Sequence, residues 1–391
     1  MSLTRLVLRN AWRHPIRSAL LVLFTALSVV LGCFLRSVVT TMDVAVKQAS
    51  TKRVTVQSAV SLFAELPSSY RDTIAAIPGV ESVNRWTWFG GTYKDGRNFF
   101  PRMAVDFDLL FAQYPELVVP LDQQRALLED RRGCLVGRGL ADQYGFAIGD
   151  SIPLMGTNFP RPDGSAWDFT VRGIYDLAPD AVFNAKIMFL SWELVDESRR
   201  ASPDAAALGS RVSLFWVKIR DGFDPGAVMA AIDARYAAGP TRTLTQTEAA
   251  FRASRIAALG NVTGFLGWIG AAVLFAVVLS AGNAMAMAAA ERGREAGILM
   301  ALGFPARRVA SLVVAESMLL TGVGGVLGAG AARAAVAGLR GLFADVLPVF
   351  MVEDVTVAAG IAGALVVGFV AALLPAVRQA ALRPLQVLRS E

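Results

Sequence analysis

Four stretches of the 391-residue chain are apolar for long enough to cross a lipid bilayer. Three of them, residues 18–35, 256–290 and 355–377, contain no charged residue, and the fourth, 309–332, contains only Glu316. An α-helix rises about 1.5 Å per residue, so roughly 20 residues cross the ~30 Å of hydrocarbon. Because such runs cannot all be buried in an ordinary soluble core, the sequence predicts an integral membrane protein with four transmembrane helices.

Composition supports a membrane protein with one large domain outside the bilayer. The chain is 54% hydrophobic and 18% charged, with a mean hydropathy of +0.48, and its charged residues concentrate between the first and second apolar runs. We expect one domain inserted there. The predicted segments are an amphipathic helix at 1–17, transmembrane helices at 18–36, 255–290, 309–332 and 355–377, an inserted domain at 37–254, loops at 291–308 and 333–354, and a tail at 378–391.

The inserted domain alternates strand and helix patterns, which predicts an α+β fold, possible as one body or as two lobes. Strands are expected at 52–60, 80–89, 169–175, 186–192 and 211–220, where apolar residues alternate with polar ones. A helix is expected at 68–77, capped by Ser68 and stopped by Pro78-Gly79, and another opens at Asp224-Pro225 and runs to about Tyr236. Asp95-Gly96 indicates a hairpin turn.

The charges divide sharply between the two sides of the predicted membrane. The termini and the 291–308 loop together carry eleven arginines and three glutamates, whereas the inserted domain holds the two signs in near balance. Basic loops stay in the cytoplasm, so both termini and this loop are predicted to be cytoplasmic and the inserted domain extracytoplasmic. The net charge of +6 therefore reflects topology and gives no support to nucleic-acid binding.

Few residues are available for chemistry. The chain has two cysteines, Cys33 in the first span and Cys134 in the inserted domain, and one histidine, His14. We expect no metal site, no disulfide, no catalytic residues of the serine or cysteine hydrolase type, and no cofactor on this chain. The sequence also lacks the G-x-x-x-x-G-K-[ST] loop that cradles nucleotide phosphates, so it predicts no ATPase site.

The basic N-terminus has a helical spacing. Arg5, Arg9, Arg13 and Arg17 recur every four residues and would lie along one side of a helix. This favours a helix in the headgroup layer that turns at Pro15 into the first span. The alternative is a basic flank that only sets the orientation of the span.

Three features inside the predicted membrane invite an explanation. Glu316 is expected to face the bundle, with Arg17, Arg292 or Arg378 within reach, and to act as a static anchor or as a moving switch. The pairs Gly324/Gly328 and Gly260/Gly264 have the four-residue spacing that lets helices approach closely. Helix packing is the interpretation we favour for both pairs.

The 291–308 loop has the pattern of a short capped helix. Residues 295–302 would place Ile298, Leu299 and Leu302 on one side, Gly303 would end the helix in a left-handed conformation, and Pro305 would prevent its continuation. A loop of this kind either docks on a partner protein or lies on the membrane as an amphipathic connector.

The same loop resembles the cytoplasmic loop of MacB/FtsX-type ABC transporter permeases, in which a Glu, a Gly, an Ala and a closing Gly recur in the order of Glu295, Gly297, Ala301 and Gly303. Further similarity covers most of the chain. It lies in Glu316-Ser317, the glycine-rich run 322–330, Leu374-Pro375-Ala376, residues 382–389 and, in the inserted domain, residues 77–83 and 171–175.

The resemblance implies a permease subunit in the bacterial inner membrane, without an ATPase site of its own. It implies a separate ABC ATPase that binds ATP and Mg, and a second permease copy, with a homodimer or a heterodimer left open. A periplasmic adaptor, an outer-membrane component and membrane lipid would be further partners. The substrate would be an amphiphile such as a lipoprotein, lipid, peptide or drug, moved by mechanotransmission from the ATPase to the extracytoplasmic domains. The residues that would contact the ATPase are Glu291, Arg294, Glu295, Gly297, Ile298, Ala301, Leu302 and Gly303.

Two alternatives differ in class. One is an FtsX-like regulator that activates a periplasmic cell-wall hydrolase and moves no substrate. The other is a membrane receptor that works without an ATPase, for which the 295–303 pattern would have no purpose.

Overall fold

The computed structural model describes residues 15–47, 49–61, 63–94, 98–161, 163–179, 181, 183–200, 209–258, 260, 262–291, 293–302, 304–343 and 351–380. These residues form two compact units. The helical bundle comprises described residues up to 42, from 260 to 343 and from 351 on, and the inserted domain comprises those from 43 to 258. The predicted amphipathic helix at 1–17 lies outside this part of the chain except for its last three residues, and so does the tail from 381 on.

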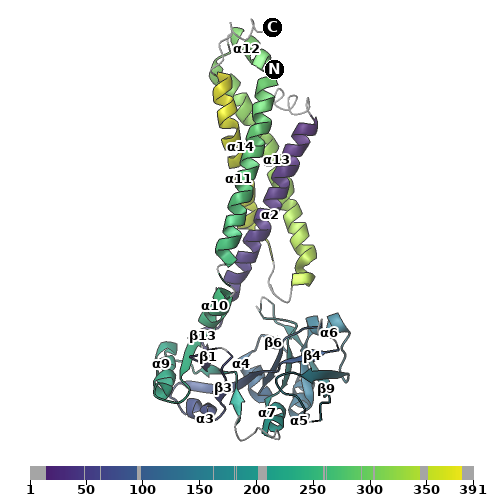
Figure 1. The fold of residues 1–391 in the computed structure, drawn as a ribbon, viewed down its shortest axis with the longest axis vertical. Helices are drawn as coiled ribbons and strands as arrows, with labels where there is room; N and C mark the ends of the chain where they lie inside the picture. The colour runs from purple at the N-terminus through teal and green to yellow at the C-terminus, as the bar shows by residue number, and fades with distance from the viewer. Residues whose placement is uncertain are drawn as a thin grey trace. The chain divides into compact units, whose positions relative to one another are not determined.

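Four helices are long and apolar enough to cross a membrane. They are α2 (Pro15–Lys47), α11 (Val262–Glu291), α13 (Ala306–Phe343) and α14 (Asp354–Ala380), and they run side by side in Figure 1. Within the most apolar 18-residue stretch of each helix, 39% of the residues are buried in α13 but only 11% in α11. α13 is therefore the interior helix, and α11 exposes most of its apolar surface.

Two helices extend beyond their predicted spans. α2 continues to Lys47 where we expected an end near residue 36, and α13 continues to Phe343 where we expected a loop from 333. The reason is that Arg36 and Arg333 mark the end of a hydrocarbon-compatible sequence, while nothing there breaks a helix. Thr40 and Thr41 donate to the Ser37 carbonyl within α2.

The predicted long second span at 255–290 is wrong as a single helix. α10 (Glu248–Ala258) ends before Gly260, which has a φ of +90°, and α11 begins at Val262. A positive φ is accessible to glycine at little cost but interrupts a right-handed helix. Gly260 therefore does not lie on a helix with Gly264, and their predicted packing pair is also corrected.

Small residues hold α13 and α14 together. A Cβ on Gly325 would lie 2.7 Å from the Ala364 Cβ, and one on Gly368 would lie 3.0 Å from the Ser317 carbonyl oxygen. The Ser317 hydroxyl donates to the Gly368 carbonyl at 2.8 Å. The helices approach this closely because Gly325 and Gly368 carry no side chain themselves.

The inserted domain is built on a mixed sheet that has eleven strands among the described residues. Its order is β13-β1-β12-β3-β5-β10-β7-β9-β8-β4, with β6 beside β9, and only the β5–β10 and β7–β9 pairs are parallel. The strands are β1 (Arg53–Ser58), β3 (Val80–Trp88), β4 (Gly91–Tyr93), β5 (Arg102–Val105), β6 (Leu117–Val118), β7 (Gly133–Gly137), β8 (Ser151–Gly156), β9 (Trp167–Leu177), β10 (Met188–Ser191), β12 (Leu214–Ile219) and β13 (Thr243–Thr247), and β2 (Leu66–Pro67) pairs with β11 (Arg211–Val212).

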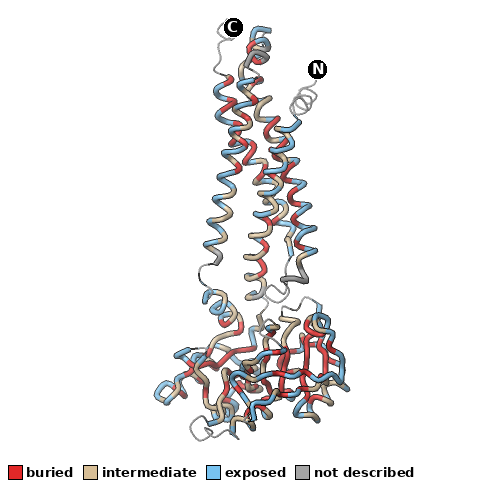
Figure 2. Tube along the Cα trace, turned by 45° about the vertical axis from the view of Figure 1, so that its right-hand side comes forward, coloured by how far each residue is buried: buried red, intermediate tan, exposed pale blue. Residues whose placement is uncertain are grey.

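Seven helices accompany the sheet in the described part of the domain (Figure 1). Two apolar clusters pack on it, one around Phe169 and Phe215 and the other around Trp86 and Phe189. Figure 2 shows buried residues running through the interior of this domain. The helices are α3 (Tyr70–Ala75), α4 (Phe107–Gln113), α5 (Leu121–Glu129), α6 (Arg138–Tyr144), α7 (Trp192–Arg200), α9 (Pro225–Tyr236) and α10. The α+β prediction is confirmed, with one large mixed sheet and a separate two-stranded sheet formed by β2 and β11.

Of the predicted helix caps in this domain, one is confirmed and one is wrong. Asp224 caps α9 as predicted, because its carboxylate accepts from the Ala227 backbone N–H at 2.9 Å. Ser68 does not cap α3. Ser69 precedes that helix, and the Ser68 hydroxyl donates to Ser210 instead. Asp95-Gly96 lies outside the described residues, and the strands around it do not form a hairpin, since β4 pairs with β8 and β5 with β3 and β10.

Candidate functional site

The predicted docking loop contains a helix, α12 (Gly293–Ala301), between α11 and α13. Ala296 is 3% exposed and Gly297 is buried, so this side of α12 packs against the bundle. Ile298, Leu302 and Phe304 are 46%, 72% and 45% exposed. A backbone hydrogen bond from the Leu302 N–H to the Ile298 carbonyl closes the last turn. α12 and the residues that follow it therefore present an apolar edge, while the opposite side of α12 packs against the bundle.

The structure places only part of the predicted contact set on that edge. Ile298, Ala301 and Leu302 are exposed, whereas Gly297 is turned inward. Gly303 and the side chains of Arg294 and Glu295 lie outside the described part of the chain. The predicted apolar side of the helix is thus present at Ile298 and Leu302.

Glu291 lies at the end of α11 and contacts α2. The Arg17 guanidinium donates through Nη2 to Glu291 Oε1 at 2.6 Å. Arg17, which we had considered as a partner for Glu316, is instead engaged at the end of the bundle. This ion pair connects the first two membrane helices close to α12.

Glu316 is 6% exposed and faces the bundle interior. It lies one residue before Ser317, whose hydroxyl bonds to α14, and one turn before Thr321, which donates to the Ser317 carbonyl at 2.9 Å. Glu316, Ser317 and Thr321 are thus buried polar residues of α13, and Ser317 links this helix directly to α14. Such groups need partners inside a membrane protein, which explains why they gather on one face.

Gly324 and Gly328 lie against α2. A Cβ on Gly324 would meet the Val22 carbonyl oxygen at 2.8 Å, and one on Gly328 would meet that of Ala26 at 2.5 Å. The four-residue spacing therefore brings the backbones of α2 and α13 together.

A cavity of about 430 Å³ lies inside the bundle between α2, α11 and α14. Its walls are largely apolar, with Val29, Leu274 and Val367 among them, and Arg36 and Glu353 stand at the end remote from α12. This combination suits a ligand with an apolar body and a polar end.

In the inserted domain, a buried ion-pair cluster joins the first and last secondary-structure elements. Arg53, the first residue of β1, donates through Nε to Glu248, the first residue of α10, at 2.7 Å. Its other nitrogens donate to Glu116 and to the Gln113 carbonyl, and its guanidinium lies 4.3 Å from the centre of the Tyr114 ring. Although burial alone would lower the pKa of Arg53, the hydrogen bonds to Glu116 and Glu248 outweigh it and raise the pKa.

Sequence reasoning missed this cluster and the glycine stripe of α14. Nothing local distinguishes Arg53 from a solvated strand residue, because its partner lies 195 positions away. The stripe does carry a signal. Small residues recur every fourth position at Gly360, Ala364, Gly368, Ala372 and Ala376, and this spacing is typical of close helix packing.

Among the residues that the structure describes, no group of three His, Cys, Asp or Glu side chains is placed to hold a metal ion.

Two family descriptions match the chain. The MacB-like periplasmic core domain matches residues 18–235, and the FtsX-like permease C-terminal domain matches residues 267–384. The first alone covers more than half of the chain, and the two follow each other in the order of the inserted domain and the bundle.

Individual relatives are more distant. The uncharacterized ABC transporter permease YvrN of Bacillus subtilis (strain 168) is 33% identical over 110 residues, which are 28% of this chain and 26% of that protein. The chain thus aligns with about a quarter of the length of this curated relative.

Solved structures with a similar inserted domain are known. The periplasmic region of MacB from Actinobacillus actinomycetemcomitans gives a TM-score of 0.39 at 11% identity, over 54% of this chain and 94% of that one. The extracellular domain of the noncanonic ABC-type transporter YknZ from Gram-positive bacteria gives a TM-score of 0.34 at 11% identity, over 50% of this chain and 98% of that one. The assignment therefore rests on the two family matches: the chain is a multi-pass membrane protein that belongs to the MacB/FtsX-type ABC transporter permease family.

Proposed function

We propose that the chain is the membrane subunit of an ABC transporter whose ATPase is a separate protein that binds ATP and Mg. The observation that carries this proposal is α12. Its inner side is packed through Ala296 and Gly297, while Ile298, Leu302 and Phe304 stand exposed beyond it. Such an apolar edge on a rigid helix fits a groove on a partner protein. An amphipathic connector lying in the headgroup layer would not need this firm backing.

The basic residues at the α12 end of the bundle favour a cytoplasmic location for that end. Both termini would then be cytoplasmic, the inserted domain would be extracytoplasmic, and the membrane would be the bacterial inner membrane. The ATPase would meet α12 on the side where ATP is available.

The Arg53 cluster suggests how movement would reach the inserted domain. α2 ends at Lys47 and β1 begins at Arg53, while β13 leads directly into α10. β1 lies between β12 and β13, so the segments that connect the domain to the bundle belong to adjacent strands. The Arg53–Glu248 ion pair links β1 to α10, the helix that follows β13. A shift of α2 or α10 would thus move this edge of the sheet as one piece, in a mechanism of mechanotransmission.

The cavity between α2, α11 and α14 supports an amphiphilic substrate, because its walls are apolar and Arg36 and Glu353 stand at one end. We propose export or extraction of such an amphiphile, a lipoprotein, lipid, peptide or drug, by two permease copies. A periplasmic adaptor and an outer-membrane component would extend the pathway.

The test is reconstitution with ABC ATPases of the same cell. We expect the purified chain alone to show no ATP turnover, and one ATPase to co-purify with it and to hydrolyse ATP faster in its presence. ATP turnover by the isolated chain, or the absence of any bound ATPase, would contradict the proposal. Co-purification of a cell-wall hydrolase would favour the regulator instead.

A further inference from the structure

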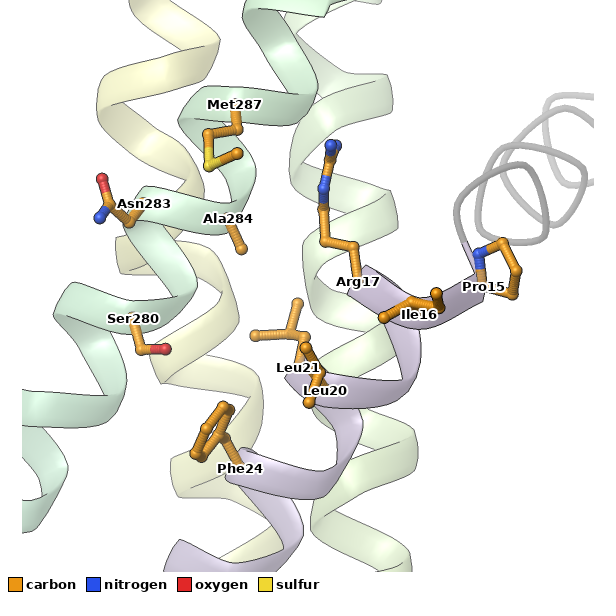
Figure 3. Close-up of a pocket in the computed structure, with 10 residues that line it drawn as sticks. All are labelled: Pro15, Ile16, Arg17, Leu20, Leu21, Phe24, Ser280, Asn283, Ala284 and Met287. Carbon is orange, nitrogen blue, oxygen red and sulfur yellow. The ribbon is translucent and has the colours of Figure 1, made fainter.

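A second hollow, distinct from the cavity above, runs between α2 and α11 near Arg17 and Glu291 (Figure 3). It has a volume of about 580 Å³. Arg17, Leu20 and Phe24 line it from α2, and Ser280, Asn283 and Met287 line it from α11. On each helix these residues are three or four positions apart and form one face. We call this hollow the α2–α11 groove.

The groove is open along an apolar wall. Leu20, Phe24 and Met287 are 47%, 48% and 56% exposed. Each lies within a helix that is long and apolar enough to cross the membrane, so what surrounds them in the cell is lipid rather than water. An acyl chain matches this wall in both chemistry and shape.

Three polar groups face the same groove without a partner in the described part of the chain. Arg17 Nη1 is buried and makes no hydrogen bond there, although Nη2 is bound to Glu291. The side chains of Ser280 and Asn283 are exposed and likewise bond to no described residue. In Figure 3, Arg17 extends to the level of Met287, beyond Leu20 and Phe24. A polar group in hydrocarbon is costly unless a ligand or neighbour satisfies it.

We propose that the α2–α11 groove is a binding site for an anionic phospholipid of the cytoplasmic leaflet. The lipid phosphate accepts a hydrogen bond from the Arg17 guanidinium, whose side chain is 21% exposed. The glycerol ester oxygens accept from Asn283, and an acyl chain lies along Leu20, Phe24 and Met287. The guanidinium suits a phosphate oxygen in charge and in geometry. The inference goes beyond the proposed function, since it needs neither an ATPase nor a transported substrate, and takes from it only the cytoplasmic location of this end of the bundle.

The test is native mass spectrometry of the purified full-length chain, incubated with phosphatidylglycerol or phosphatidylcholine that carry the same palmitoyl and oleoyl chains. We expect preferential retention of phosphatidylglycerol, by roughly fivefold, which corresponds to about 1 kcal/mol for one basic residue near an anionic headgroup. Arg17→Gln should abolish the preference. The matched control Arg378→Gln removes an arginine at the same end of the bundle, from α14, and should leave the preference unchanged.

A second variant keeps the test decisive if Arg17→Gln fails to fold. Ala284 also lines the groove, so Ala284→Trp should fill it and reduce the retention of both lipids several-fold. Equal retention of the two lipids by the unaltered chain, or an unchanged preference in Arg17→Gln, would overturn the proposal. So would disulfide-linked dimers of Asn283→Cys in a chain without Cys33 and Cys134, because a second copy would then occupy the groove.

Discussion

Arg53 Nε lies 2.7 Å from Glu248 Oε2, and both side chains are almost completely buried, at 8% and 1% exposure. We expect Arg53→Met to cost on the order of 3 kcal/mol of unfolding free energy, because it removes one of the two arginines that hold the buried Glu248 carboxylate, the other being Arg252. The double variant Arg53→Met/Glu248→Met should cost less than the two single changes combined.

The measurement is chemical unfolding of the full chain in detergent, followed by tryptophan fluorescence. Arg138–Asp176 supplies the control, since this pair is about half exposed and should contribute less than about 1 kcal/mol. Strict additivity of the Arg53 and Glu248 variants would show that the two residues do not act together.

Docking on the ATPase should depend on the exposed edge of α12. Ala301→Trp adds bulk at an exposed position, and Glu295→Lys reverses a charge that the family resemblance assigns to the contact. Both variants should insert normally yet lose ATPase binding in a pull-down, together with stimulated ATP turnover. Glu129→Lys, a charge reversal at an exposed site of the inserted domain, is the control. Wild-type binding by both α12 variants would make the helix a membrane connector.

Two glycines of α13 should respond in opposite directions to the same substitution. A Cβ on Gly328 would come within 2.5 Å of the Ala26 carbonyl oxygen, whereas one on Gly330 meets no atom within 4 Å. Gly328→Ala should therefore destabilise the bundle by about 1–3 kcal/mol. Gly330→Ala should be neutral or stabilise by up to about 1 kcal/mol through helix propensity. Thermal unfolding in detergent compares them, and equal effects would refute the close contact.

Cys134 should resist alkylation well above neutral pH. It is fully buried, and burial, aided by the nearby Asp130 carboxylate, raises the pKa of its thiol. Only the thiolate reacts, so raising the pH to about 8.5, where an ordinary thiol is half ionised, should accelerate labelling little in the folded chain. A maleimide should label Cys134 rapidly only after denaturation. Glu129→Cys, in a chain with Cys134→Ala, should react at once, and fast labelling of native Cys134 would contradict its burial.

The proposed orientation can be tested with the same reagent in a membrane-impermeant form. In intact spheroplasts a single cysteine at Glu129 should be labelled, whereas one at Leu302, the residue that follows α12, should be labelled only after permeabilisation. Both positions are exposed, so accessibility differs by membrane side alone. The reverse pattern would remove the basis for an ATPase contact at α12.

The four spans were predictable because hydrophobic run length is a strong local signal. Alternating apolar and polar residues indicated β1, β3, β9 and β10 and the range of β11 and β12, but the shorter strands β2, β4–β8 and β13 were not predicted. The ends of the helices were not predicted either. Hydropathy indicates where the membrane-spanning sequence ends, so it did not predict that α2 continues past Arg36. It carries no information on backbone dihedral angles, so it did not predict the helix break at Gly260. The Arg53–Glu248 pair could not be found from pattern at all, since its partners meet only through the pairing of β1 with β13.

That pairing also bears on how such a chain can diversify. Val54 of β1, the first strand of the inserted domain, pairs in register with Thr247 of β13, its last strand. The chain therefore enters and leaves the domain at neighbouring positions. A domain whose two ends are neighbours can be exchanged for another, or shortened to a turn, without stretching the flanking helices. This connection lets the inserted domain change in size or sequence without a matching change in the membrane helices.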